Sequence, residues 1–125
     1  MSVLLDSSVV IDILRARPEA LRYARGLQEV PICSEITRVE VLRGVRSPER
    51  RTTERFFGVV LWIPLDEQVG RRAGQIGRDL RRSHPGLATA DLVIAATALE
   101  YGLEIAACNV RHFPMFERLQ PPYRA

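Results

Sequence analysis

Four short apolar segments alternate with helical patterns along this chain, and this alternation constrains the fold more than any other feature. The segments are residues 3–5, 30–34, 61–65 and 103–108, and their length and composition predict buried strands. Strands separated by helices indicate a parallel sheet that is flanked by helices on both faces. A chain of 125 residues has room for a single α/β domain, which we place over residues 1–125.

Apolar spacing and helix-boundary residues predict the helices. They fall over residues 8–14, 18–27, 34–45, 47–60, 66–83 and 89–102. Ser47 and Asp66 are expected N-caps, Thr89 or an earlier residue caps the last helix, and Gly102 ends it. Residues 109–113 are expected to form a turn or a short helix.

The composition argues against membrane insertion and secretion. No apolar run approaches the roughly 20 residues of a membrane span, and the N-terminus lacks the regions of a signal peptide. We therefore expect a cytoplasmic protein with no membrane partner. The net charge is +3 and all 18 basic residues are arginines, which supports nucleic-acid contact only weakly. Cys33 and Cys108 form no CxxC motif and are expected to be small buried hydrophobic residues.

Three acidic residues differ from the others because their neighbours are apolar or small. Asp6 follows the first strand, Glu40 lies between two valines, and Asp91 lies in the first turn of an apolar helix. Each has an ordinary structural explanation. Asp6 could cap a helix, Asp91 could be a first-turn residue that the helix dipole favours, and Glu40 could pair with Arg38 or Arg43.

The alternative is that the three acids meet at one edge of the sheet. Ligands of such sheets bind beyond the carboxyl ends of the strands, which is where Asp6 lies. Carboxylates that share a site repel one another unless a cation joins them. Because the candidate ligands are all oxygen atoms, the cation expected is Mg²⁺ or Mn²⁺, which suits phosphodiester hydrolysis.

Four segments of the chain resemble, in order, the four motif regions of PIN-domain ribonucleases, and most closely those of VapC-like toxins. They are LLDSSVVIDIL, SEITRVEVLRG, ADLVIAATALEYG and CNVRHF. The resemblance implies a Mg²⁺-dependent endoribonuclease, with Mn²⁺ as a substitute, which belongs to a type II toxin–antitoxin pair. It also implies a cellular RNA as substrate, a cognate antitoxin as inhibitor and a homodimer.

The resemblance assigns residues as well. The three acids of the family fall on Asp6, Glu40 and Asp91, as catalytic residues and metal ligands. The hydroxyl that follows the first acid matches Ser7 or Ser8, and we favour Ser8 because it holds the serine position of the family pattern.

The fourth region departs from the pattern that many PIN domains share. CNVRHF holds no acid, and Asn109 is the catalytic candidate there, as a neutral oxygen ligand or the holder of a water. This departure puts a second metal ion in question. His112 could be a proton shuttle or a structural residue. The alternatives to a toxin are an RNA-processing PIN nuclease without an antitoxin and a degenerate PIN domain that only binds a partner.

Overall fold

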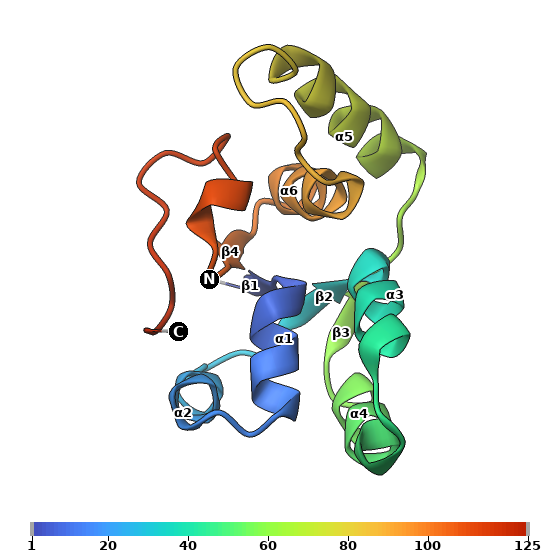
Figure 1. Ribbon diagram of the computed structural model, residues 1–125, viewed down its shortest axis with the longest axis vertical. Coiled ribbons are helices and arrows are strands. Elements are labelled where there is room, and N and C mark those ends of the chain that lie inside the picture. The colour runs from blue at the N-terminus through green and yellow to red at the C-terminus, as the bar shows by residue number, and fades with distance from the viewer. Residues whose placement is uncertain (1, 125) are drawn as a thin grey trace.

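The strands of the computed structural model, which describes residues 2–124, form a four-stranded parallel sheet (Figure 1). Their order is β3-β2-β1-β4. The strands are β1 (Val3–Leu5), β2 (Ile32–Ser34), β3 (Leu61–Ile63) and β4 (Glu104–Ala106). In the central strand, Leu4 lies opposite Ile32 of β2 and Ile105 of β4. The predicted α/β class with a parallel sheet is confirmed.

Six α-helices and two 3-10 helices connect the strands within the described residues. They are α1 (Ser7–Leu14), α2 (Pro18–Arg25), α3 (Glu35–Gly44), η1 (Ser47–Glu49), α4 (Arg50–Phe57), α5 (Glu67–Asp79), α6 (Thr89–Tyr101) and η2 (Val110–His112). No helix of residues 2–124 is long and apolar enough to cross a membrane.

Side chains of β1 point alternately to two hydrophobic cores, as the two-residue period of a strand requires. Val3 and Leu5 pack into one core with residues of α1, α3 and α4. Leu4 packs into the other core with residues of α6. All three side chains are almost fully buried, so the strand that carries Asp6 at its end is fixed from both faces.

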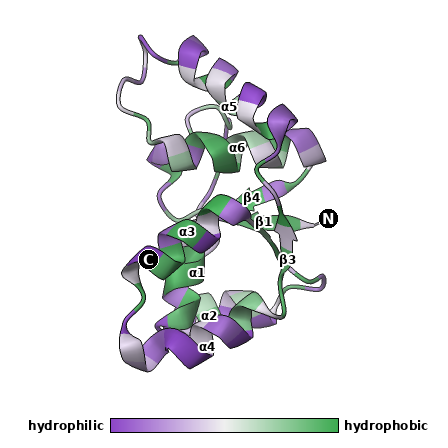
Figure 2. Cartoon of the chain, turned by 90° about the vertical axis from the view of Figure 1, so that its right-hand side faces the viewer, coloured by the Kyte–Doolittle hydropathy of each residue, from purple (hydrophilic) through white to green (hydrophobic). Residues whose placement is uncertain are grey.

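Helix α6 is the most buried helix, and α5 lies on its outer side (Figures 1 and 2). Residues 93–98 of α6 are all buried, which explains the apolar sequence noted above. The two helices approach closely at Gly77, where an added Cβ would lie 2.9 Å from the Leu92 side chain. Helix α6 is therefore held firmly on both sides, and the first turn that carries Asp91 is held with it.

Some predicted helix boundaries are confirmed and others are wrong. Asp66 caps α5 by accepting a hydrogen bond from the Val69 N–H (2.9 Å), and Gly102 ends α6 in the left-handed conformation (φ +62°). Ser47 is not an N-cap, because it lies inside η1. Glu49 instead accepts bonds from the Arg46 N–H (3.0 Å) and guanidinium (2.6 Å) and fixes the turn one residue earlier.

Two predicted helices are also shorter than expected. The helix expected over residues 47–60 divides into η1 and α4 and ends at Phe57. The helix expected over residues 66–83 ends at Asp79, and the following turns are held by a bond from the His84 N–H to the Leu80 carbonyl (2.8 Å).

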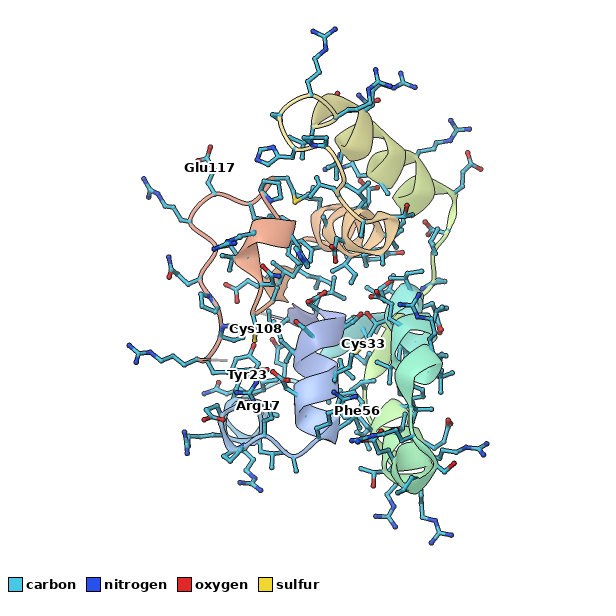
Figure 3. All side chains as sticks on the ribbon, viewed as in Figure 1. Arg17, Tyr23, Cys33, Phe56, Cys108 and Glu117 are labelled. Atoms are coloured by element: carbon cyan, nitrogen blue, oxygen red, sulfur yellow. The ribbon has the colours of Figure 1, made fainter. Side chains whose placement is uncertain are left out.

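The two cysteines are free thiols on separate elements (Figure 3). Cys33 is fully buried in β2, and its burial raises the pKa of the thiol to about 12. Cys108 is partly buried and lies near Tyr123 of the C-terminal segment. The Tyr123 hydroxyl donates to Asp12 of α1 (2.7 Å), which ties this segment to the helix that follows Asp6.

Candidate active site

Asp6 lies at the junction of β1 and α1, where the strand passes into the helix with no intervening loop. Its carboxylate caps α1 by accepting bonds from the Ser8 N–H (3.4 Å) and the Ser8 hydroxyl (2.6 Å). Both bonds end on the same oxygen, Oδ2, so the cap and a role in cation binding do not exclude each other. Asp6 is only 5% exposed, and burial raises the pKa of its carboxyl group, with a further contribution from the charge of Glu40.

Glu40 faces Asp6 from α3. This helix begins after Ser34, whose hydroxyl accepts a bond from the Ile36 N–H (3.2 Å). The Glu40 carboxylate accepts a bond from the hydroxyl of Ser7, with 2.5 Å between Ser7 Oγ and Glu40 Oε1. Its position is therefore set by the helix that Asp6 caps.

Neither arginine suggested as a partner pairs with Glu40. Arg38 forms two hydrogen bonds with Glu35 (2.6 and 3.1 Å), and its guanidinium stacks 3.8 Å from the centre of the Trp62 ring. Arg43 is exposed on α3 and forms no ion pair within residues 2–124. The ion-pair explanation of Glu40 is wrong, because Arg38 is held on the other side of α3.

Asp91 lies in the first turn of α6, with a side chain that is 14% exposed. Burial raises the pKa of its carboxyl group to about 6, the nearby His112 opposes this shift, and the charges of Asp6 and Glu40 add to it. The three acids therefore lie near enough to affect one another, although they come from three separate segments. This electrostatic coupling supports the predicted convergence of Asp6, Glu40 and Asp91, which stays a prediction.

His112 and Asn109 lie beside Asp91, after β4. His112 Nδ1 is 3.3 Å from Asp91 Oδ2, and Asn109 Nδ2 is 3.0 Å from His112 Nε2. The neutral tautomer with its proton on Nδ1 satisfies both contacts, because Nδ1 then donates to the carboxylate and Nε2 accepts from the amide. The segment that lacks the fourth acid thus contributes an imidazole to the site, a contact that sequence spacing did not reveal.

The two serines after Asp6 serve different acids. Ser8 bonds to Asp6, while Ser7 is buried and bonds to Glu40. Sequence reasoning favoured Ser8 and overlooked the contact of Ser7 with Glu40. An available signal was the adjacency of the two serines at the start of a helix, where successive side chains point in different directions.

The donor set fits a hard divalent cation. Asp6 follows β1, Glu40 lies in α3 and Asp91 lies in the first turn of α6, and the charges of the first two raise the pKa of the third. Carboxylate oxygens are ligands that suit Mg²⁺ or Mn²⁺. Within residues 2–124, no three His, Cys, Asp or Glu side chains are close enough to form a ready-made metal site.

The stability of the metal-free protein should rise as the pH falls from about 7.5 to about 5. Asp91 has a pKa of about 6 when folded, against 3.8 as its ordinary value. The folded state therefore binds the proton more tightly, and acidification relieves the cost of the buried charge. Thermal unfolding in EDTA at both pH values tests this.

Asp91→Asn is the matched variant for this pH series, since it keeps His112, Asp6 and Glu40 in place around the altered side chain. It should reduce the pH dependence, whereas Glu100→Gln at the far end of α6 should retain it. An identical dependence in wild type and Asp91→Asn would contradict the raised pKa.

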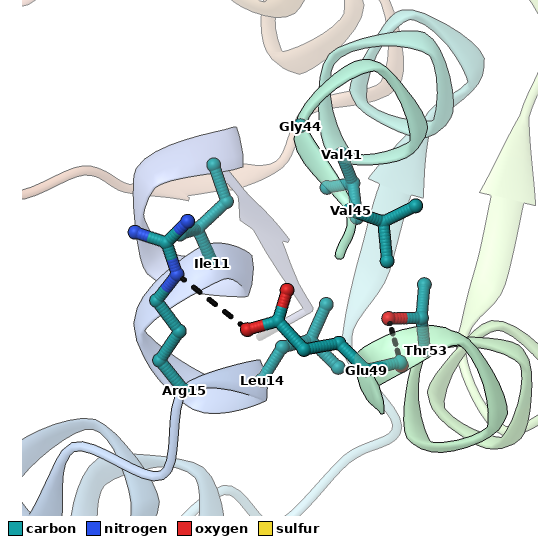
Figure 4. Close-up of a pocket in the computed structure, with 8 residues that line it drawn as sticks. All are labelled: Ile11, Leu14, Arg15, Val41, Gly44, Val45, Glu49 and Thr53. Carbon is teal, nitrogen blue, oxygen red and sulfur yellow. Dashed lines mark hydrogen bonds and ion pairs between the residues drawn. The ribbon is translucent and has the colours of Figure 1, made fainter. Parts of the chain in front are cut away.

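The pocket drawn in Figure 4 is separate from these acids. It is largely apolar and lies between α1, α3 and the segment that begins α4, with an Arg15–Glu49 ion pair (3.9 Å) at its rim. Its lining residues are Ile11, Leu14, Arg15, Val41, Gly44, Val45, Glu49 and Thr53. None of them is an acid of the candidate site.

The sequence matches the PIN domain family over residues 3–118, and the chain belongs to this family. It is 41% identical to Ribonuclease VapC19 of Mycobacterium tuberculosis over 123 residues, which cover 96% of this chain and 98% of that protein. It is 40% identical to Ribonuclease VapC10 of the same organism, with 97% and 92% covered.

The solved structure of DNA-bound VapBC from Salmonella typhimurium has a similar fold. It superposes with a TM-score of 0.77 at 26% identity, over 99% of this chain and 96% of that one. The resemblance to PIN domains and to VapC proteins is thereby confirmed.

Proposed function

We propose that this protein is an endoribonuclease toxin of a type II toxin–antitoxin pair, with residues 1–125 as one PIN domain. The observation that supports this most is the electrostatic coupling of Asp91 to Asp6 and Glu40, three acids from separate segments. It occurs in a chain that is 41% identical to a named ribonuclease over nearly its full length. We further propose a cytoplasmic location, a homodimer and Mg²⁺ as the cation, with Mn²⁺ as a substitute.

Asp6, Glu40 and Asp91 would hold the cation, and Asn109 would contribute an amide or a water. When bound, the cation lowers the pKa of a water and neutralises charge that develops on a phosphoryl group. Ser8 orients Asp6 through its hydroxyl and its N–H. His112 orients Asp91, and its exposed ring could carry a proton between Nδ1 and solvent.

A PIN nuclease of RNA processing and a non-catalytic binding module are the other candidates. The VapC names of the relatives favour the toxin, and the coupling of the three acids argues against a degenerate site. A small antitoxin reading frame beside the gene would separate the toxin from the processing nuclease.

Cleavage of total cellular RNA by the purified protein tests the proposal. We expect discrete products with Mg²⁺, none in EDTA, and recovery on addition of Mn²⁺. Sequencing the new RNA ends would identify the substrate. Cleavage that persists in EDTA would refute metal dependence, and binding of RNA without cleavage would favour the binding module.

Antitoxin binding should weaken as Mg²⁺ is raised. The clustered carboxylates form an acidic site in a net-basic protein, and an antitoxin Arg or Lys that entered it would replace the charge of the cation. Calorimetry of the pair over a Mg²⁺ series measures this at constant ionic strength, because screening alone also weakens charge pairs. An unchanged affinity would show that the antitoxin blocks RNA access elsewhere.

A further inference from the structure

Three threonines are completely buried within helices, and one of them is bonded unusually. Thr53 of α4 donates to the carbonyl of Glu49, the last residue of η1 (2.8 Å), and Thr97 donates to the carbonyl of Val93 within α6 (2.7 Å). This is the ordinary way for a helical threonine to satisfy its hydroxyl, and Figure 4 draws it for Thr53. Thr37 of α3 differs, because its hydroxyl contacts Ser7 of α1 at 3.2 Å.

This contact continues to a carboxylate of the candidate site. Ser7 Oγ is 3.2 Å from Thr37 Oγ1 and 2.5 Å from Glu40 Oε1. A serine hydroxyl has one proton, and a carboxylate only accepts. The proton of Ser7 therefore belongs to the bond with Glu40, and Thr37 donates its own proton to Ser7. The result is a relay of two hydroxyls that ends on the acid.

Both hydroxyls of the relay are buried, and this burial lets them fix the position of the Glu40 carboxylate. Thr37 is 0% exposed and Ser7 is 6% exposed, so water does not compete for either hydroxyl. Hydrogen bonds to charged acceptors are stronger than those between neutral groups. Glu40 has a long side chain, and the bond from Ser7 is the one hydrogen bond that its carboxylate forms within residues 2–124. Ser34 caps α3 and so sets Thr37 and Glu40 one turn apart on the face toward α1.

We infer that Thr37 and Ser7 are positioning residues that aim Glu40 at the bound cation. This inference rests on the proposed function, adds Thr37 to the site and gives Ser7 a role separate from that of Ser8. Groups behind a metal ligand commonly alter metal affinity by about 10- to 100-fold. The competing explanation is that the hydroxyl pair only joins α1 to α3.

Titration of Mn²⁺ into the RNA-free protein separates the two explanations. Thr37→Val keeps the size of the side chain and removes the hydroxyl, and it should weaken Mn²⁺ binding by about 10-fold or more. Thr37→Ser should recover most of the affinity. Thr97→Val is the matched control, since this hydroxyl is equally buried but bonds to a backbone carbonyl. It should lower the melting temperature and leave Mn²⁺ affinity unchanged.

Ser7→Ala is the second variant, in case Thr37→Val does not fold. It removes one oxygen atom from the relay and should weaken Mn²⁺ binding at least as much as Thr37→Val does. Wild-type affinity in a folded Thr37→Val or in Ser7→Ala would overturn the inference and leave the proposed function standing. A wild-type protein that neither binds Mn²⁺ nor cleaves RNA would overturn both.

Discussion

Asp6→Asn should abolish metal-dependent RNA cleavage and leave the fold intact. The substitution keeps the volume of the side chain and removes the charge that a cation needs. Asparagine caps helices as well as aspartate does, and the buried carboxylate already has a raised pKa, so stability should be equal or higher. We expect cleavage to fall by more than roughly 100-fold, since even groups behind a ligand are worth about 10- to 100-fold.

Asp66→Asn provides the matched control for this experiment. Asp66 is also the N-cap of a helix, and its carboxylate accepts from the Val69 N–H of α5. This second substitution should leave cleavage unchanged. Full activity in Asp6→Asn, measured with the same RNA and the same Mg²⁺ concentration, would mean that Asp6 is a helix cap and nothing more.

Overproduction of the wild-type chain should arrest growth, and overproduction of Asp91→Ala should not. Asp91 couples electrostatically to both other acids and contacts His112, so the alanine variant loses a carboxylate of the candidate site and the contact with His112. We expect the difference in colony-forming cells to be large, because the arrest depends on turnover by a catalyst. Growth curves and immunoblots after induction give the measurement at matched protein levels.

Glu100→Ala, in the last turns of the same helix, controls for a general effect of removing an acid from α6. Glu100 pairs with Arg72 of α5 (3.6 Å), away from the candidate site. It should remain toxic. Equal arrest by wild type and Asp91→Ala would count against nuclease activity as the source of toxicity.

The fold was predictable because its signals are local. A buried strand is a short apolar run, and a helix is marked by its spacing and its ends. The order of the strands agrees with the α/β class, and Asp66 and Gly102 act where their chemistry predicts. Ser47 is not the cap, because the Glu49 carboxylate accepts a bond from the Arg46 N–H and the helical turn therefore begins after Arg46. The preferences of single residues for cap positions do not predict which of two neighbours forms the cap.

The acids of the candidate site were predictable, but their partners were not. Asp6, Glu40 and Asp91 stand out because a charged group among apolar neighbours needs an explanation. The choice between Arg38 and Ser7 as the partner of Glu40 depends on tertiary packing. Arg38 is held on Trp62, a residue of β3, and Ser7 reaches Glu40 from α1. Both contacts join residues that are far apart in the sequence, so no local sequence pattern predicts them.

The pairing of β1 with β4 has a consequence for synthesis of the protein. Leu5 lies beside Ala106, so β1 receives its second neighbour only after residue 106 has been synthesised. His112 lies after β4, so its contact with Asp91 can form only then. The candidate site is therefore incomplete on the ribosome until β4 and the residues that follow it have emerged and folded. Ribosomes stalled at Gly102 should carry nascent chains that do not cleave RNA, although all three acids have been made.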